Sequence, residues 1–253
     1  MKTLRAAIAA LAFALAAPAV LAAGDEIPAP KQKWSFDGAF GTFDRGELQR
    51  GFQVYKEVCA ACHAAKYVAF RTLRDIGFSE AEVKALAATY EVTDGPDDSG
   101  EMFKRPGRPS DKFPSPFPNE KAARAANGGA YPLDLSLIAK ARAQGPDYLA
   151  ALLSGYSQPP AGFQLGEGLH YNKYFPGQQI AMPQPLNPDQ VTYADGTKAT
   201  VEQMARDVSA FLMWTAEPKL EERKRLGFKV MIFLLILTGL FIAAKKRVWA
   251  DLK

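Results

Sequence analysis

Both cysteines of this 253-residue chain stand in one pentapeptide, Cys59-Ala60-Ala61-Cys62-His63. Two thiols at this spacing can each add across a vinyl group at a porphyrin edge, while the next residue offers its imidazole to the iron. The motif therefore predicts one covalently bound c-type haem with His63 as an axial ligand, and we expect the other His63 ring nitrogen to donate to a backbone carbonyl. A thioredoxin-like redox pair would need a βαβ setting, and a zinc site would need further ligands at ordinary spacing.

The ligand opposite His63 separates electron carriers from gas-binding proteins, because a methionine thioether closes the iron site and favours ferrous iron. Among the six methionines, Met182 lies in a proline-rich stretch, residues 175–186, that shows no helical periodicity. Prolines restrict the free loop and so help to hold a weak sulfur ligand in place. We therefore predict Met182 as the sixth ligand, and Met102 and His170 remain the alternatives.

The two ends of the chain are apolar in different ways. Residues 1–22 combine a basic start, a short alanine-rich core and small residues before the end, which is typical of a secretory signal peptide. Residues 226–244 carry a single charge, and as a helix they would extend about 28 Å, close to the ~30 Å hydrocarbon core of a bilayer. We expect an exported domain over residues 23–218, followed by a membrane anchor and short cytoplasmic tail over residues 219–253.

Charge is distributed unevenly along the chain. The formal net charge is +4, but residues 1–22 carry +2 and residues 219–253 carry +6, which leaves −4 for residues 23–218. Because the bases cluster at the expected membrane, we expect lipid phosphates as their partners and no nucleic acid. Five acidic residues within 91–101 form either a solvated loop or a docking surface for a basic partner.

Helix signals between the ends are short and flanked by capping residues, and alternating strand patterns are scarce. The predicted helices cover residues 44–58, 79–90, 119–126, 135–143 and 200–215. Residues 92–118 and 154–199 are rich in Gly, Pro and Asp and are expected to be long loops. The predicted fold is a mainly α domain with long loops, joined through a bend near Pro218 to one C-terminal transmembrane helix.

Several segments together resemble the cytochrome c1 family, the haem subunits of the cytochrome bc1 complex. These segments are residues 59–63, 101–103, 122–130, 174–178, 181–183, 211–218 and 223–225. The resemblance implies a cytochrome c-like haem domain, with Cys59 and Cys62 as thioether attachments and with His63 and Met182 as axial ligands. It also implies Arg142 beside a haem propionate, and Asn127 and Tyr148 in the haem pocket.

The resemblance further implies a single-electron carrier on the periplasmic face of a bacterial cytoplasmic membrane, within a respiratory or photosynthetic chain. Its partners would be cytochrome b, the Rieske iron-sulfur protein as donor and a soluble cytochrome c as acceptor. Quinol–cytochrome c reductase activity would belong to the assembly. One alternative is another membrane-anchored monohaem cytochrome that feeds a terminal oxidase. A second is a gas-binding or peroxidatic haem enzyme, which needs an exchangeable sixth ligand.

The methionine loop departs from some bacterial relatives, in which a disulfide braces the segment before the methionine. This chain has no cysteine there. We expect the loop to be stiffened by its prolines, which are Pro159, Pro160, Pro176, Pro183 and Pro185.

Overall fold

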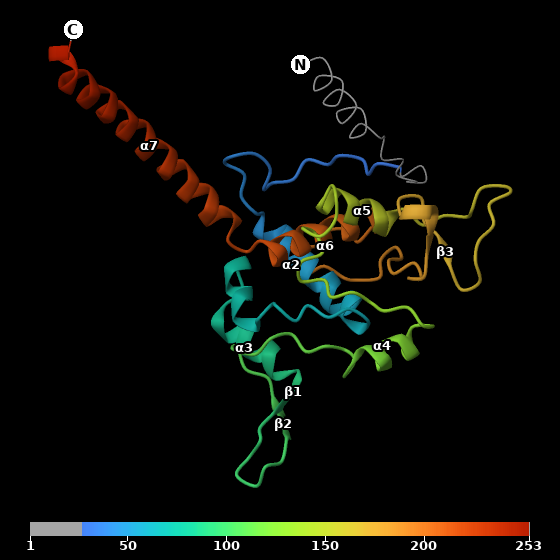
Figure 1. The fold of residues 1–253 in the computed structure, drawn as a ribbon. Helices are drawn as coiled ribbons and strands as arrows, with labels where there is room; N and C mark the ends of the chain where they lie inside the picture. Colours follow the sequence, from blue (N-terminus) through green and yellow to red (C-terminus); the bar gives the residue numbers. More distant parts are fainter. Residues whose placement is uncertain (1–26, 253) are drawn as a thin grey trace, which may run out of the picture.

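The computed structural model describes residues 27–252, so the predicted signal peptide at residues 1–22 lies outside the described residues. A helical body surrounds two crossing helices, α2 and α6, and α7 extends from it alone (Figure 1). The helices are α2 (Arg45–Glu57), α3 (Glu80–Ala88), α4 (Glu120–Ala126), α5 (Pro146–Ser154), α6 (Val201–Ala216) and α7 (Leu220–Val248). Short 3₁₀ helices are η1 (Cys59–Ala61), η2 (Phe70–Ile76), η3 (Pro176–Gln178) and η4 (Ala250–Leu252). The strands are β1 (Glu91–Asp94), β2 (Phe103–Pro106), β3 (His170–Tyr171) and β4 (Gln179–Ile180), paired as two antiparallel hairpins.

The core forms where α2 and α6 cross at very short range. A Cβ atom on Gly51 would lie only 2.0 Å from the backbone oxygen of Asp207, so only glycine permits this approach. The fully buried Asp207 carboxylate is paired with the Arg50 guanidinium, whose Nε lies 3.0 Å from Oδ2. Beside them, the rings of Phe52 and Phe211 pack in a tilted arrangement with centroids 5.7 Å apart. These contacts fix the helix that leads directly into the cysteine motif.

Four predicted helices are confirmed, and each begins at a residue whose side chain caps it. Asp44, Asn119 and Thr200 accept a hydrogen bond from the backbone nitrogen three residues later. Ser79 does the same within a full capping box with Glu82. A side-chain cap satisfies backbone N–H donors that have no partner in the first helical turn. Because the capping residue is adjacent to the helix, the local sequence is enough to predict these four helix starts.

The predicted helix over residues 135–143 is wrong. The segment forms successive turns instead, and its first residue, Leu135, donates its backbone N–H to the distant carbonyl of Ala64 at 2.7 Å. The helix begins later, with Pro146 in its first turn after Gly145 at φ +51°. Proline fits the first turn of a helix, where no N–H partner is needed, so the Gly145-Pro146 pair starts a helix here and does not end one.

The prediction of a long loop over residues 92–118 is wrong in part, because this segment contains most of the β1–β2 hairpin. Arg105 on β2 binds the carboxylates of Asp94 on β1 and of Asp111 beyond the hairpin. After Ser154, where α5 ends, residues 155–199 contain only η3 and the two-residue strands β3 and β4, in line with the long loop expected there.

The C-terminal helix is longer than the predicted span. The chain leaves α6 after Ala216 and enters α7 at Leu220, so the bend near Pro218 is confirmed. From Val230 to Ala244 the helix carries no charged side chain, and its apolar stretch is not buried against the described chain. The structure thus places one helix that is long and apolar enough to cross a membrane outside the packed body.

Candidate haem site

The cysteine motif forms a single tight turn at the end of α2. The backbone nitrogens of Cys62 and His63 both donate to the carbonyl oxygen of Cys59, at 3.1 and 2.8 Å. Burial raises the pKa of the Cys59 thiol to about 12. The turn places both thiols of the motif at the end of α2, directly before His63 in the chain. This is the arrangement that attachment to a porphyrin edge requires.

The His63 ring is oriented by a backbone carbonyl, as the sequence analysis predicts. Its Nδ1 lies 2.7 Å from the carbonyl oxygen of Leu133. A carbonyl only accepts, so Nδ1 carries the proton and Nε2 is the nitrogen able to bind iron. Burial lowers the pKa of His63, although the Leu133 hydrogen bond opposes this shift. The carbonyl of His63 itself accepts from the Tyr55 hydroxyl at 3.3 Å.

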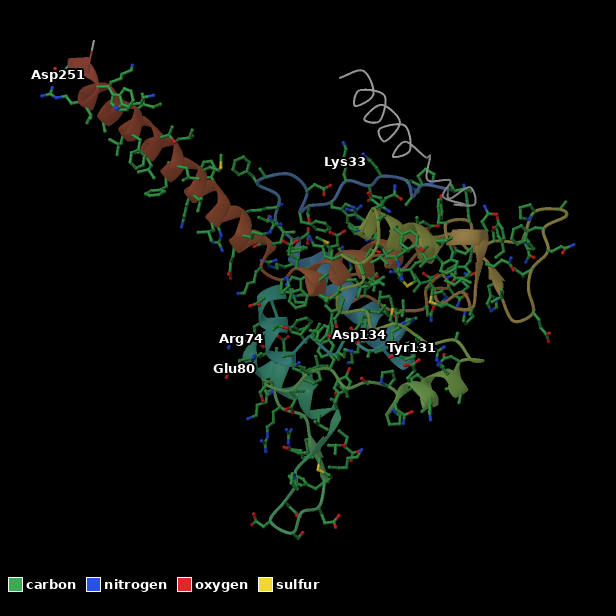
Figure 2. All side chains as sticks on the ribbon, in the orientation of Figure 1. Lys33, Arg74, Glu80, Tyr131, Asp134 and Asp251 are labelled. Carbon is green, nitrogen blue, oxygen red and sulfur yellow. The ribbon has the colours of Figure 1, made fainter. Side chains whose placement is uncertain are left out.

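The segment after His63 is fastened to the segment that carries Leu133. Leu135 donates its N–H to the Ala64 carbonyl at 2.7 Å. The backbone nitrogen of Lys66 donates to Oδ2 of Asp134 at 3.0 Å, and Figure 2 labels this aspartate in the middle of the molecule. These bonds join residues about 70 positions apart. They keep the imidazole and its supporting carbonyl in one rigid unit.

Met182 is half-buried, and a tyrosine holds its backbone. The Tyr156 hydroxyl donates to the Met182 carbonyl oxygen at 3.0 Å. Tyr156 forms an isolated antiparallel bridge with Asn172, whose wholly buried side chain donates to the Leu152 carbonyl in α5 at 2.7 Å. The methionine loop is therefore tied to α5 without a disulfide. Sequence reasoning found the prolines but missed Tyr156, because nothing local marks a contact across 26 residues.

The other methionines and His170 have different surroundings. Met102 lies in the loop between β1 and β2 and is 59% exposed. Met204 and Met213 are buried on α6, so packing accounts for both. His170 is exposed on β3 and pairs in register with Ile180, two residues before Met182.

Arg142 and Tyr148 line a common cavity of about 230 Å³, together with Phe175 and Pro176. The Arg142 side chain is exposed and donates to the neighbouring carbonyl of Ala141. Within residues 27–252 it forms no salt bridge, so its charge can meet an added anion. Asn127 is not among the residues that line this cavity. It ends α4, and its side-chain nitrogen donates to the Ala123 carbonyl at 2.7 Å.

The donor set as a whole fits a covalently bound haem. It offers two thiols on one turn, an imidazole with Nε2 available and a thioether on a braced loop. Across residues 27–252 there is no group of three or more His, Cys, Asp or Glu side chains that could hold a metal ion alone. The fold and this donor set define a class, the membrane-anchored c-type haem proteins.

Comparison with known proteins supports a narrower assignment. Residues 34–252 match the model of the Cytochrome C1 family. The chain is 52% identical to cytochrome c1 of Rhodospirillum rubrum, and the match covers 88% of each protein. It is 54% identical to "Cytochrome c1 1, heme protein, mitochondrial" of Arabidopsis thaliana, over 90% of this chain and 74% of that protein. The chain belongs to the cytochrome c1 family.

One relative is much longer than this chain. The protein named "Cytochrome b/c1" of Bradyrhizobium diazoefficiens is 54% identical over 97% of this chain, but the chain spans only 40% of its length. The resemblance to the haem subunit of the cytochrome bc1 complex is confirmed by these matches, and so is the expectation of one covalently bound haem. The mainly α fold with one membrane-length helix is confirmed as well.

Proposed function

We propose that this chain receives single electrons from a Rieske iron-sulfur protein and passes them to a soluble cytochrome c, as part of a quinol–cytochrome c reductase assembly. The observation that carries the proposal is the His63 ring, fixed by the Leu133 carbonyl so that Nε2 can bind iron beside two attachment thiols. When bound, the haem supplies an iron that accepts and releases one electron. Catalysis of quinol oxidation belongs to the assembly.

Each residue of the site has a defined part in holding this group. Cys59 and Cys62 would attach it through thioether bonds, and His63 and Met182 would bind its iron. Leu133 and Tyr156 keep both ligands in place through their hydrogen bonds, so little rearrangement accompanies a change in charge. The remaining pocket residues have supporting parts.

Arg142 would pair with a haem propionate from the cavity it shares with Tyr148, because a guanidinium binds carboxylates strongly. Asn127 is assigned to the pocket by the family resemblance alone. Arg142 and Asn127 would thus help to bind the haem and would take no part in the transfer of the electron.

The membrane position follows from α7 and from the expected export of the domain. We place the haem domain in the periplasm of a bacterium, α7 in the cytoplasmic membrane and the C-terminus in the cytoplasm. The "Cytochrome b/c1" relative carries both cytochrome names in one protein. That name supports cytochrome b as a partner of this chain.

Affinity purification of the detergent-solubilised complex tests this assignment. We expect a haem-stained band of this chain to co-purify with cytochrome b and a Rieske protein, and the haem to stay attached after acid–acetone extraction. Isolation with a terminal oxidase and without those two subunits would favour the alternative carrier. Loss of colour on extraction would contradict covalent attachment.

The acidic stretch at residues 91–101 supports a docking role for the β1–β2 hairpin, which projects from the body (Figure 1). Two of its acids are paired within the hairpin, Glu91 with Lys104 and Asp94 with Arg105. Asp97 caps its own turn by accepting from the backbone nitrogens of two later residues. Asp98 and Glu101 are exposed, and within the described chain neither forms a salt bridge.

Reversing Asp98 and Glu101 to Lys should slow reduction of a basic soluble cytochrome c about tenfold at low salt, with the difference shrinking as salt rises. Steered association is an electrostatic rate effect, so the rate constant should be measured across ionic strength. Glu91→Gln with Lys104→Gln is the matched control, because it removes one charge of each sign and leaves the net charge of the hairpin unchanged. An unchanged salt dependence in the double reversal would exclude this surface as the docking site.

A further inference from the structure

A pocket of about 330 Å³ lies where α7 leaves the body of the molecule. On one side it is lined by residues 39–42 of the segment that precedes α2. On the other side it is lined by one face of the first turns of α7, residues 221, 224, 225, 228 and 229. Spacings of three and four residues bring side chains together on a helix face, so this wall is a continuous strip. Neither the cysteine motif nor the methionine loop contributes to it.

Three cations and one carboxylate come together in the pocket wall. The carboxylate of Glu221 is occupied by the N–H of Phe43 at 2.9 Å and the guanidinium of Arg45 at 3.0 Å. The ammonium of Lys224 donates to two neutral carbonyls, those of Phe36 at 2.6 Å and Gly41 at 3.2 Å. Arg225 and Lys229 also line the wall. In the described chain none of these three cations forms a salt bridge, so the pocket holds net positive charge.

The pocket wall also presents apolar surface. The rings of Phe40 and Phe228 meet edge to face with centroids 5.8 Å apart, and they are 79% and 55% exposed. Beyond Lys229 the helix carries only apolar or small side chains up to Ala244, apart from Thr238. A basic pocket thus opens directly beside the start of a membrane-length apolar helix.

We propose that this pocket binds one anionic phospholipid, with its phosphate headgroup against Lys224, Arg225 and Lys229 and its acyl chains along α7. A phospholipid combines negative charge with a long apolar tail, which matches the order of these surfaces along the helix. Free inorganic phosphate would use the cations but not the exposed rings of Phe40 and Phe228. Lys224 also pins the segment before α2 to the helix, so a bound headgroup would set the angle at which α7 leaves the body.

This inference rests on α7 lying in a membrane, as proposed above. The test uses the intact complex, purified in detergent with added phosphatidylglycerol and then washed with lipid-free detergent. The retained phosphatidylglycerol is counted by quantitative mass spectrometry. Arg225→Gln with Lys229→Gln is the variant, since Lys224 supports the chain fold. Lys84→Gln with Lys121→Gln removes the same charge from exposed positions outside the pocket and is the control.

We expect the Arg225/Lys229 variant to lose one phosphatidylglycerol per chain while the control keeps the wild-type number. Washing with inorganic phosphate should displace none from the wild type. Equal retention in variant and wild type would overturn the proposal. Haem staining of sedimented membranes is measured in parallel for all variants. Loss of the stained chain from the membranes would show that α7 is not a membrane anchor, whereas equal lipid retention by a membrane-bound variant would show that the lipid site is wrong.

A photo-crosslinker identifies the occupant directly. With p-benzoylphenylalanine in place of Phe40, irradiation of the complex should add the mass of a phospholipid to this chain. A cross-link to another polypeptide would show that a protein partner fills the pocket, and the lipid proposal would then be wrong.

Discussion

At the scale of single residues, the two proposed iron ligands are placed by partners far away in the chain. The motif around Cys59 and His63 can be recognised in the sequence, because covalent haem attachment requires this spacing of two cysteines and a histidine. Its supports are not readable: Leu133 lies 70 residues from His63, and Tyr156 lies 26 residues from Met182. A backbone carbonyl or a tyrosine hydroxyl in a loop gives no local pattern, so only the fold shows these contacts.

Removing the Tyr156 hydroxyl should weaken the hold on the methionine loop. In Tyr156→Phe the Met182 carbonyl loses its donor, at a cost of about 1 kcal/mol, while the ring keeps its packing. We expect the covalent haem to remain, carbon monoxide to bind the reduced protein several-fold faster, and the midpoint potential to fall. Stopped-flow mixing and a redox titration measure both effects.

Tyr171→Phe is the matched control for that variant, because Tyr171 is a buried tyrosine whose ring packs on Phe163. It should behave like the wild type in both measurements. If Tyr156→Phe changes only the thermal unfolding temperature and leaves carbon monoxide binding untouched, Tyr156 has a structural role alone.

At the scale of elements, the sequence predicted helices well where the start signal is local. Side-chain caps mark α2, α3, α4 and α6 within three residues of each start. The prediction failed over residues 135–143, where a hydrogen bond to Ala64 replaces helical pairing. It also missed the β1–β2 hairpin, whose strands are four residues each and are joined to the body by Arg105. In both cases pairing with another segment, distant for Leu135 and nearby for the hairpin, overrides local propensity.

The Arg105–Asp111 pair should make the hairpin sensitive to acid. The hydrogen bond from Arg105 holds the pKa of Asp111 at about 2, below the ~3.9 of an unfolded aspartate. A depressed folded pKa stabilises the folded state above the unfolded pKa, and this contribution is lost as pH falls from about 4 towards 2. The protection factors of the amides at residues 91–106, which correct the observed exchange rate for the intrinsic rate at each pH, should therefore fall over that range in the wild type.

In Asp111→Asn we expect faster exchange in the hairpin already at neutral pH and a smaller change on acidification. Glu91→Gln is the control, because the exposed pair of Glu91 with Lys104 contributes little, about 0–1 kcal/mol. Identical pH profiles for Asp111→Asn and the wild type would show that this pair does not hold the hairpin.

At the scale of the whole molecule, charge and shape separate the proposed contacts. The acidic hairpin and α7 project from different sides of the body (Figure 1), so the two proposed contacts involve separate surfaces. Residues 23–218 carry −4 while residues 219–253 carry +6, so composition alone already divided the chain into a membrane part and a domain. The pocket beside Phe40 could not be predicted, because its two walls are about 180 residues apart in the sequence.

Replacement of Met182 by leucine tests the central claim most directly, with Met102→Leu as the matched control on the exposed hairpin loop. The measurement is carbon monoxide binding to the reduced protein, together with its spectrum and midpoint potential. We predict that Met182→Leu keeps its covalent haem, binds carbon monoxide rapidly and shows a lower midpoint, while Met102→Leu and the wild type do not. An unchanged spectrum and midpoint in Met182→Leu would contradict ligation by His63 and Met182.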